Sequence, residues 1–248
     1  MKHVGDTYKT NGYGNLVITK YVDTNEVHVK FVDTGYETVS CICNIKTGRV
    51  KDKSLPTVHG VGIVGEEVTK VNGKQCRVYG VWCAMIQRCY DEKFLQRHPT
   101  YKGCSVSDNF KYYPYFKDWY NRQIGSEEEN WQLDKDILIK DNKLYSEDTC
   151  VFVPHRINSL ITKRAADRGN YPLGVHGIFG RSERFCSQCS NNTGKQKRLG
   201  RFKTAQEAFQ AYKTYKEALI KQVANEYKEQ LDYRVYEALM NYEVNEND

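Results

Sequence analysis

The sequence contains no hydrophobic run long enough to cross a membrane and no signal peptide at its start. It also lacks the regular cysteine spacing of a disulfide framework, because its nine Cys residues are odd in number and scattered. These absences predict reduced thiols, a cytoplasmic location and no membrane partner. With 248 residues, of which 40% are hydrophobic, the chain can hold two or three small domains.

The cysteines also lack the companions that a zinc site needs. Cys41 and Cys43 form one close pair and Cys186 and Cys189 another, but neither pair has a second Cys pair or closely spaced His residues beside it. A structural zinc site takes four protein ligands. The sequence therefore gives little support for zinc, and zinc binding by Cys186 and Cys189 stays open.

Excess positive charge is concentrated in one part of the chain. Residues 155–203 hold eleven Lys or Arg and two acids, a net charge of +9, whereas the whole chain carries only +6, so the remainder carries −3. Such a concentration is typical of a surface that binds a polyanion. The alternative is a solvated basic surface without a ligand.

The same part of the chain has the pattern of a small sheet followed by a helix. Short strands are expected at 175–179, 185–188 and 197–199, separated by the polar turns 180–183 and 190–195. Thr204 and Glu207 form a capping box, which begins a helix. Its apolar residues recur at a spacing of three or four: Ala205, Ala208, Phe209, Tyr212, Tyr215 and Leu219. Residues 169–228 are therefore predicted to form a three-stranded antiparallel sheet packed on one helix.

A narrow ribbon of this kind fits the major groove of duplex DNA. Leu199 and Phe202 must face the helix to complete the core, which leaves basic side chains to contact phosphates and guanine edges. The DNA-binding residues expected on this basis are Arg181, Arg184, Lys195, Lys197, Arg198, Arg201 and Lys203.

The pattern also resembles a known family. Gly174-Val175, the Phe185-Cys186 strand and the run Leu-Gly-Arg-Phe-Lys-Thr-Ala-Gln-Glu-Ala-Phe-Gln-Ala-Tyr at 199–212 are similar to the plant APETALA or ethylene-response-factor DNA-binding domain. That domain also occurs in bacteriophage homing endonucleases. The resemblance covers most of residues 170–227, although the family's usual Trp in the second strand is Phe185 here. It implies that double-stranded DNA is the partner.

The first half of the chain is less informative. Residues 1–52 read as short strands at 15–21, 27–32 and 37–43 with a hairpin signal at 33–35, which predicts a small β-barrel-like domain. A protein contact is as plausible for this domain as a nucleic-acid contact, and the sequence names no partner. Residues 53–75 read as a linker. From 76 to 124, aromatic residues recur at helical spacing, which indicates a core more than a surface for stacking bases.

Residues 133–158 show an acidic strand, a polar hairpin at 140–143, a second strand at 151–154 and a helix that carries Asn158. This order resembles the ββα-metal core of phage HNH endonucleases, and the stretches 82–90 and 116–119 resemble what precedes that core in the same proteins. Together the two resemblances cover most of residues 80–165. The resemblance implies an HNH-like region at 76–168 that binds a divalent metal, Mg²⁺, through Asp136 and Asn158. Its orienting position falls on Thr149.

The family's general-base position falls on Ile137, which cannot accept a proton. His155 is the nearest imidazole in sequence and is the candidate catalytic residue. In a shifted register Asp134 becomes a ligand and Lys135 takes the base position, where a protonated amine is a poor base. Asp134 and Asp136 are equally well explained as a solvated strand face.

The sequence thus predicts an α+β protein with an N-terminal barrel, a central HNH-like region that lacks the usual general base, and a C-terminal DNA-binding sheet and helix. Residues 229–248 add a helix and a frayed acidic tail at 245–248. Two functions follow: a metal-dependent nuclease that nicks DNA in the cytoplasm of a bacterial host, or an inactive descendant that binds DNA as a repressor or antagonist. The target sequence and oligomeric state do not follow from the sequence.

Overall fold

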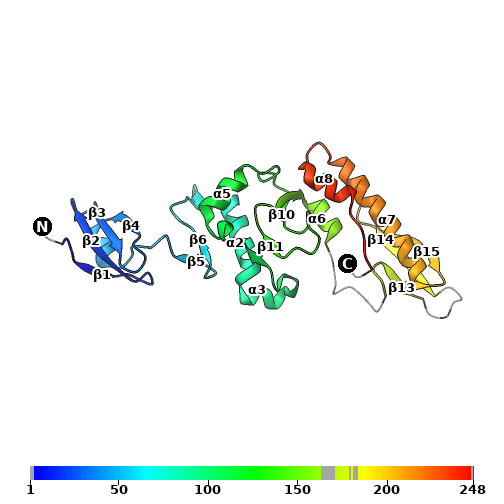
Figure 1. Cartoon of the computed structure of the whole chain (residues 1–248), viewed down its shortest axis with the longest axis horizontal. Coiled ribbons are helices and arrows are strands. Elements are labelled where there is room, and N and C mark those ends of the chain that lie inside the picture. The colour runs from blue at the N-terminus through cyan, green and yellow to red at the C-terminus, as the bar shows by residue number, and fades with distance from the viewer. Residues whose placement is uncertain (1–2, 163–170, 179, 181–183, 247) are drawn as a thin grey trace. The chain divides into compact units, whose positions relative to one another are not determined.

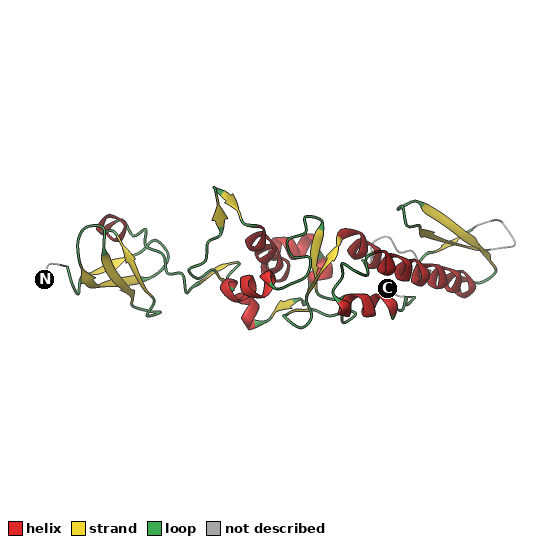
Figure 2. Cartoon of the chain, turned by 90° about the horizontal axis from the view of Figure 1, so that it is seen from above, coloured by secondary structure: helices red, strands yellow, loops and turns green. Residues whose placement is uncertain are grey.

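The computed structural model describes residues 3–162, 171–178, 180, 184–246 and 248. It is a mixed α+β structure, as expected, and divides into two compact units (Figures 1 and 2). Unit 1 comprises Met1–Tyr120 and Lys143–Ser146, and unit 2 comprises Asn121–Asn142 and Glu147–Asp248. None of the helices in the described residues is both long and apolar enough to span a membrane.

The N-terminal part of unit 1 is a four-stranded antiparallel sheet (Figure 1). Its strands are β1 (Thr7–Lys9), β2 (Asn15–Tyr21), β3 (Val27–Phe31) and β4 (Glu37–Ser40), in that order. Alternate side chains form its core: Leu16, Ile18, Val27, Val29 and Phe31, joined by Ile45 and Val50. Among the described strands β1 and β4 remain edges, so the sheet is an open meander and not the expected barrel. The last expected strand ends early because α1 (Ile42–Lys46) takes up the backbone there.

The rest of unit 1 is largely helical. Residues 53–75, for which we expected a linker, contain two short hairpins, β5 (Pro56–Val58) with β6 (Gly62–Ile63) and β7 (Lys70–Val71) with β8 (Lys74–Gln75). The remaining elements are α2 (Arg77–Tyr90), α3 (Glu92–Arg97), η1 (Pro99–Tyr101), β9 (Ser105–Val106), α4 (Asp108–Lys111), α5 (Tyr113–Asn121) and β11 (Leu144–Tyr145), which pairs with β9.

The aromatic residues at helical spacing in this part are mostly core residues, as predicted, whereas Tyr112 and Tyr115 are exposed. Trp82, Phe110 and Phe116 are fully buried, and Trp82 Nε1 donates a hydrogen bond of 2.7 Å to the Phe110 carbonyl. The rings of Phe110 and Trp119 lie 4.7 Å apart. These rings are therefore not available for stacking on bases.

Unit 2 begins with a strand pair followed by a helix. β10 (Trp131–Asp134) pairs antiparallel with β12 (Val151–Pro154), from Trp131 opposite Pro154 to Asp134 opposite Val151. α6 (His155–Ile161) follows β12 directly. All four residues of β12 are buried, whereas Gln132 of β10 is exposed, so β12 is the interior strand of the pair.

The C-terminal sheet and helix form as predicted. β13 (Val175–Gly177), β14 (Phe185–Ser190) and β15 (Gln196–Phe202) make an antiparallel sheet with β14 in the centre, and α7 (Ala205–Glu226) runs along one face (Figure 2). Thr204 and Glu207 make both hydrogen bonds of the capping box. α8 (Tyr233–Met240) packs on α7.

One hydrophobic core joins the strand pair to the sheet and helix. Val151, Val153 and Ile157 belong to the same buried cluster as Phe209 and Leu219 of α7. The β10–β12–α6 part of the predicted HNH-like region is therefore packed together with the predicted DNA-binding domain in unit 2, whereas residues 76–120 of that region belong to unit 1.

The C-terminal residues do not form the frayed tail that we expected. Val244 is buried, and Asp248 is only 6% exposed. Lys140 Nζ donates to Asp248 Oδ2 at 2.6 Å, and the Asn245 amide donates to the same oxygen at 2.8 Å. The ion pair and the burial of Val244 hold these residues in place, although their polar composition suggested fraying. Asn247 lies outside the described residues.

Two glycines with positive φ angles give a test of this packing. At Gly174 (φ +76°) an added Cβ would lie 2.0 Å from Cδ2 of Tyr212, whereas at Gly194 (φ +80°) nothing lies within 4 Å. Gly194→Ala should cost about 1 to 2 kcal/mol from the backbone alone. Gly174→Ala should cost about 1 to 3 kcal/mol more, because Tyr212 is buried and must move. Urea unfolding of the two variants measures the difference, and equal losses would contradict it.

Candidate nucleic-acid interface

A β-bulge determines which side chains each face of the C-terminal sheet presents. Ser187 pairs with Gly200 and Gln188 with Arg198, so Leu199 is an extra residue in β15. Residues three apart in a regular strand face opposite sides of the sheet. Because the bulge inserts one residue, Arg198 and Arg201 share one face, and Leu199 and Phe202 share the other.

We call the face away from α7 the outer face. Cross-strand pairing places on it seven residues: His176, Cys186, Gln188, Ser190, Gln196, Arg198 and Arg201. Arg198 and Arg201 are exposed, as is His176. Within the described residues of the three strands there is no Asp or Glu. The outer face is therefore a cationic, hydrogen-bonding surface that carries no opposing carboxylate of its own.

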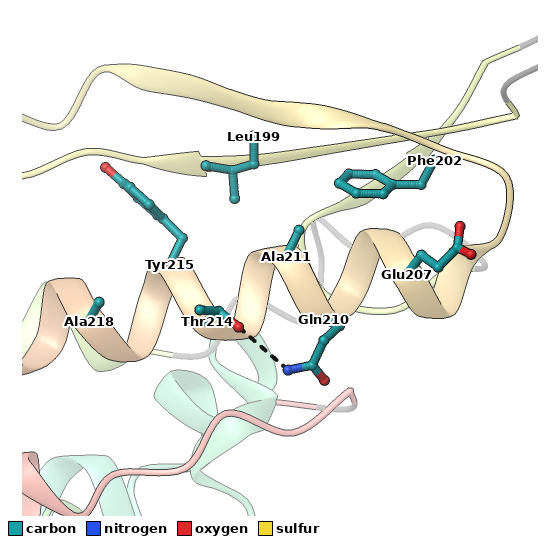
Figure 3. Close-up of a pocket in the computed structure, with 8 residues that line it drawn as sticks. All are labelled: Leu199, Phe202, Glu207, Gln210, Ala211, Thr214, Tyr215 and Ala218. Atoms are coloured by element: carbon teal, nitrogen blue, oxygen red, sulfur yellow. Dashed lines mark hydrogen bonds between the residues drawn. The ribbon is translucent and has the colours of Figure 1, made fainter.

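The opposite face packs on α7. Leu199 and Phe202 point toward the helix, as predicted, and line an open hollow of about 700 Å³ with residues of α7 (Figure 3). Lys197 also lies on this side, because its ammonium group is 4.8 Å from the centre of the Tyr215 ring. Lys197, which we expected to bind DNA, is therefore held against the helix by a cation–π contact.

The other expected DNA-binding residues lie around the sheet. Lys195 is exposed in the turn before β15, and Lys203 is exposed between β15 and α7. Arg184 is exposed immediately before β14, and its carbonyl accepts a hydrogen bond of 2.7 Å from the Ile178 amide. Arg181 lies outside the described residues. Cations therefore lie next to the strands of the sheet: Arg184 just before β14, Lys195 in the turn before β15, and Lys203 between β15 and α7.

Sequence reasoning missed His176 and Gln188, because it searched only for cations. Their ring Nε2 and amide Nε2 atoms lie 2.8 Å apart on the outer face. Strict alternation from the buried Val175 and Ser187 would have placed both residues on this face. That signal was present in the sequence.

The geometry of β14 argues against a zinc site at Cys186 and Cys189. β14 is the regular strand of the bulged pair, so these two cysteines face opposite sides of the sheet. Cys189 is buried in the core with Tyr212, and burial raises the pKa of its thiol. One metal ion could not bind both sulfurs without breaking the sheet.

The residues expected to hold a divalent metal lie on different elements, Asp136 after the end of β10 and Asn158 on α6, and each is hydrogen-bonded to another side chain. Lys135 Nζ donates to Asp136 Oδ2 at 2.8 Å, and Asn158 Nδ2 donates to Gln132 Oε1 at 2.6 Å. In the part of the chain that the structure describes, no group of three or more His, Cys, Asp or Glu residues is arranged to hold a metal ion.

The positions that the resemblance assigned to water activation hold two buried residues and one exposed histidine. Ile137, at the general-base position, is buried in the core of unit 2, and Thr149 is also buried. His155, the candidate catalytic residue, is exposed at the first turn of α6, where its backbone amide donates to the Asn130 carbonyl at 2.8 Å.

Asp134 is the most perturbed carboxyl of this region. Its Oδ1 accepts hydrogen bonds from the amides of Asp136 (2.9 Å) and Ile137 (2.8 Å), which close the turn after β10. Burial, followed by the nearby charge of Asp136, raises the pKa of Asp134 to about 6. The group therefore shapes the turn and does not extend into solvent as a strand-face carboxylate would.

Comparison of the chain with family models, with curated proteins and with solved structures gives no significant match. The functional argument therefore depends on the residues and their geometry.

The raised pKa of Asp134 predicts a pH-dependent stability. The folded pKa of about 6 exceeds the ordinary value of 3.8, so the folded state holds the proton more tightly. This group's contribution is complete below about pH 4 and is lost as pH rises through about 6, by on the order of 2 to 3 kcal/mol. Asp134→Asn, which keeps an acceptor oxygen, should remove that loss.

Urea unfolding of wild type and Asp134→Asn between pH 4 and pH 8 measures this loss of stability, as the change with pH in the difference between their free energies of unfolding. Asp136→Asn is the matched comparison. Removing the neighbouring charge should lower the pKa of Asp134 and so make the loss of stability with pH smaller, without abolishing it. A constant difference between wild type and Asp134→Asn across this range would show that Asp134 does not titrate as inferred.

Proposed function

We propose that this protein binds double-stranded DNA through the outer face of the β13–β14–β15 sheet. The observation that carries the proposal is the bulge at Leu199, which brings Arg198 and Arg201 to one exposed face. A surface of this kind attracts phosphates, and neutralising them releases counterions and supplies most of the sequence-independent affinity.

The shape of the sheet supports insertion into a groove. A β-ribbon is narrow enough to enter the major groove, where a guanidinium can bind guanine O6 and N7 together. Arg198 and Arg201 have the position for such contacts, while Lys195, Lys203 and Arg184 surround the face and suit phosphate contacts. The resemblance of residues 170–227 to the APETALA-type domain supports the same partner.

Arg198 and Lys197 provide a matched pair, because they are adjacent cations on opposite faces of β15. An Arg that binds guanine contributes about 1 to 3 kcal/mol, so Arg198→Gln should weaken binding to a selected duplex by about tenfold. Lys197→Gln removes the same charge and should weaken it by less than about twofold. Fluorescence anisotropy of the full chain at fixed salt measures both, and equal losses would exclude the outer face as the contact.

A second candidate function is metal-dependent nicking of DNA. The order β10, β12, α6, with carboxylates at the end of β10, favours it and resembles an HNH core. Asp136 and Asn158 would hold the Mg²⁺ ion. Asp136 and Asn158 fit a divalent cation poorly, because the Lys135 ammonium already forms an ion pair with Asp136. Activation of water is also disfavoured, because the buried Ile137 occupies the general-base position. We therefore favour DNA binding without cleavage, in the manner of a repressor or antagonist.

A supercoiled-plasmid assay separates the two candidates. Wild type incubated with Mg²⁺ or Mn²⁺ should leave the plasmid intact at concentrations that bind it fully, because the isoleucine at the general-base position, Ile137, cannot accept a proton from water. Asp136→Ala and Asn158→Ala serve as controls for contaminating nuclease. Nicking by wild type that both variants lose would overturn the proposal of binding without cleavage.

A further inference from the structure

The middle of the outer face holds a pair of polar side chains, Gln188 and His176. Gln188 lies on the central strand β14, directly opposite Arg198 of β15. His176 lies on β13 opposite Cys186, two residues before Gln188. The backbone amide of Gln188 donates to the Gly174 carbonyl at 3.0 Å, so the base of the side chain is fixed by the sheet.

The contact between them restricts the orientation of the Gln188 amide. The two Nε2 atoms lie 2.8 Å apart, a hydrogen-bond distance that requires one donor and one acceptor. A carboxamide nitrogen only donates, whereas a neutral imidazole nitrogen without its proton accepts. His176 therefore accepts from one N–H of Gln188. Within the described residues the Gln188 side chain makes no other hydrogen bond, so its second N–H and Oε1 form an adjacent donor and acceptor.

An adjacent donor and acceptor on a planar amide match the major-groove edge of adenine. Adenine presents N6 as a donor and N7 as an acceptor, and Gln binds both together. An amide whose rotation is already fixed loses less conformational entropy when it binds. Gln188 also occupies the central strand, where a ribbon in the groove lies closest to the base pairs.

We propose that Gln188 reads adenine in one A·T base pair of the target and that His176 is the positioning residue that orients its amide. The inference rests on the proposed DNA binding and adds a sequence preference to it. In this arrangement Oε1 accepts from adenine N6, and the remaining N–H donates to N7. Arg198, which lies opposite Gln188, would bind guanine or phosphate, and Gln188 adds the choice of adenine.

The test is selection of duplexes from a random pool by the full chain, repeated with variants. Wild type should prefer adenine at one position. Gln188→Ala should reduce that preference by about tenfold, while the affinity for random duplex and its salt slope stay within about twofold of wild type. Gln188→Glu should move the preference to cytosine, because a carboxylate accepts from cytosine N4.

His176 and Gln196 complete the design. His176→Ala should lower the adenine preference partially, and His176→Gln, which restores an acceptor, should recover it. Gln196→Ala is the matched control, since Gln196 is a glutamine on the same face. It lies at the start of β15 and its side chain is bonded to Ser190 at 3.1 Å. This substitution should leave the preference unchanged. Thermal unfolding of each variant reports whether the sheet is intact.

The outcomes distinguish this inference from the proposed function. If wild type does not bind duplex DNA, both fail. If wild type binds with a steep salt slope but selects no adenine, or if both Gln188 variants keep the wild-type preference, the reading role fails and DNA binding stands. A loss of preference in Gln196→Ala equal to that in Gln188→Ala would likewise overturn it.

Discussion

Burial of one apolar stripe on α7 is the interaction on which unit 2 depends. The stripe contacts all three strands of the C-terminal sheet as well as α6 and α8, and it belongs to one core with β12. Because Leu199 and Phe202 must face this helix, the rest of β15 has to accommodate them. The bulge at Leu199 allows both side chains to face α7, and as a result Arg198 and Arg201 share the outer face.

Much of the C-terminal fold was readable from the sequence. The capping box at Thr204 and the spacing of three and four residues after it specify a helix whatever surrounds it, and the polar turns delimit the strands. These signals are local, so they survive without knowledge of the tertiary structure. The face of each side chain in β15 was not readable, because one inserted residue reverses the alternation.

The rest required three-dimensional information. Closure of the N-terminal strands depends on whether β1 and β4 meet, and no local pattern reports that. The acidic composition of the last residues suggested fraying because the sequence does not show that Lys140, more than a hundred positions earlier, would pair with Asp248. At the candidate metal site, the spacing of Asp136 and Asn158 was visible, but their partners Lys135 and Gln132 were not.

The continuous core of unit 2 makes its two halves thermodynamically inseparable. Val153 and Phe209 contribute to the same buried cluster, so residues of the β10–β12 pair and of the sheet should lose their protection from hydrogen exchange in one cooperative opening. A ligand on the outer face would then slow exchange in β12 and α6, although it touches neither. A fragment cut between the two halves would expose Ile157 and Leu219 to water, and neither piece would retain the stability of the whole.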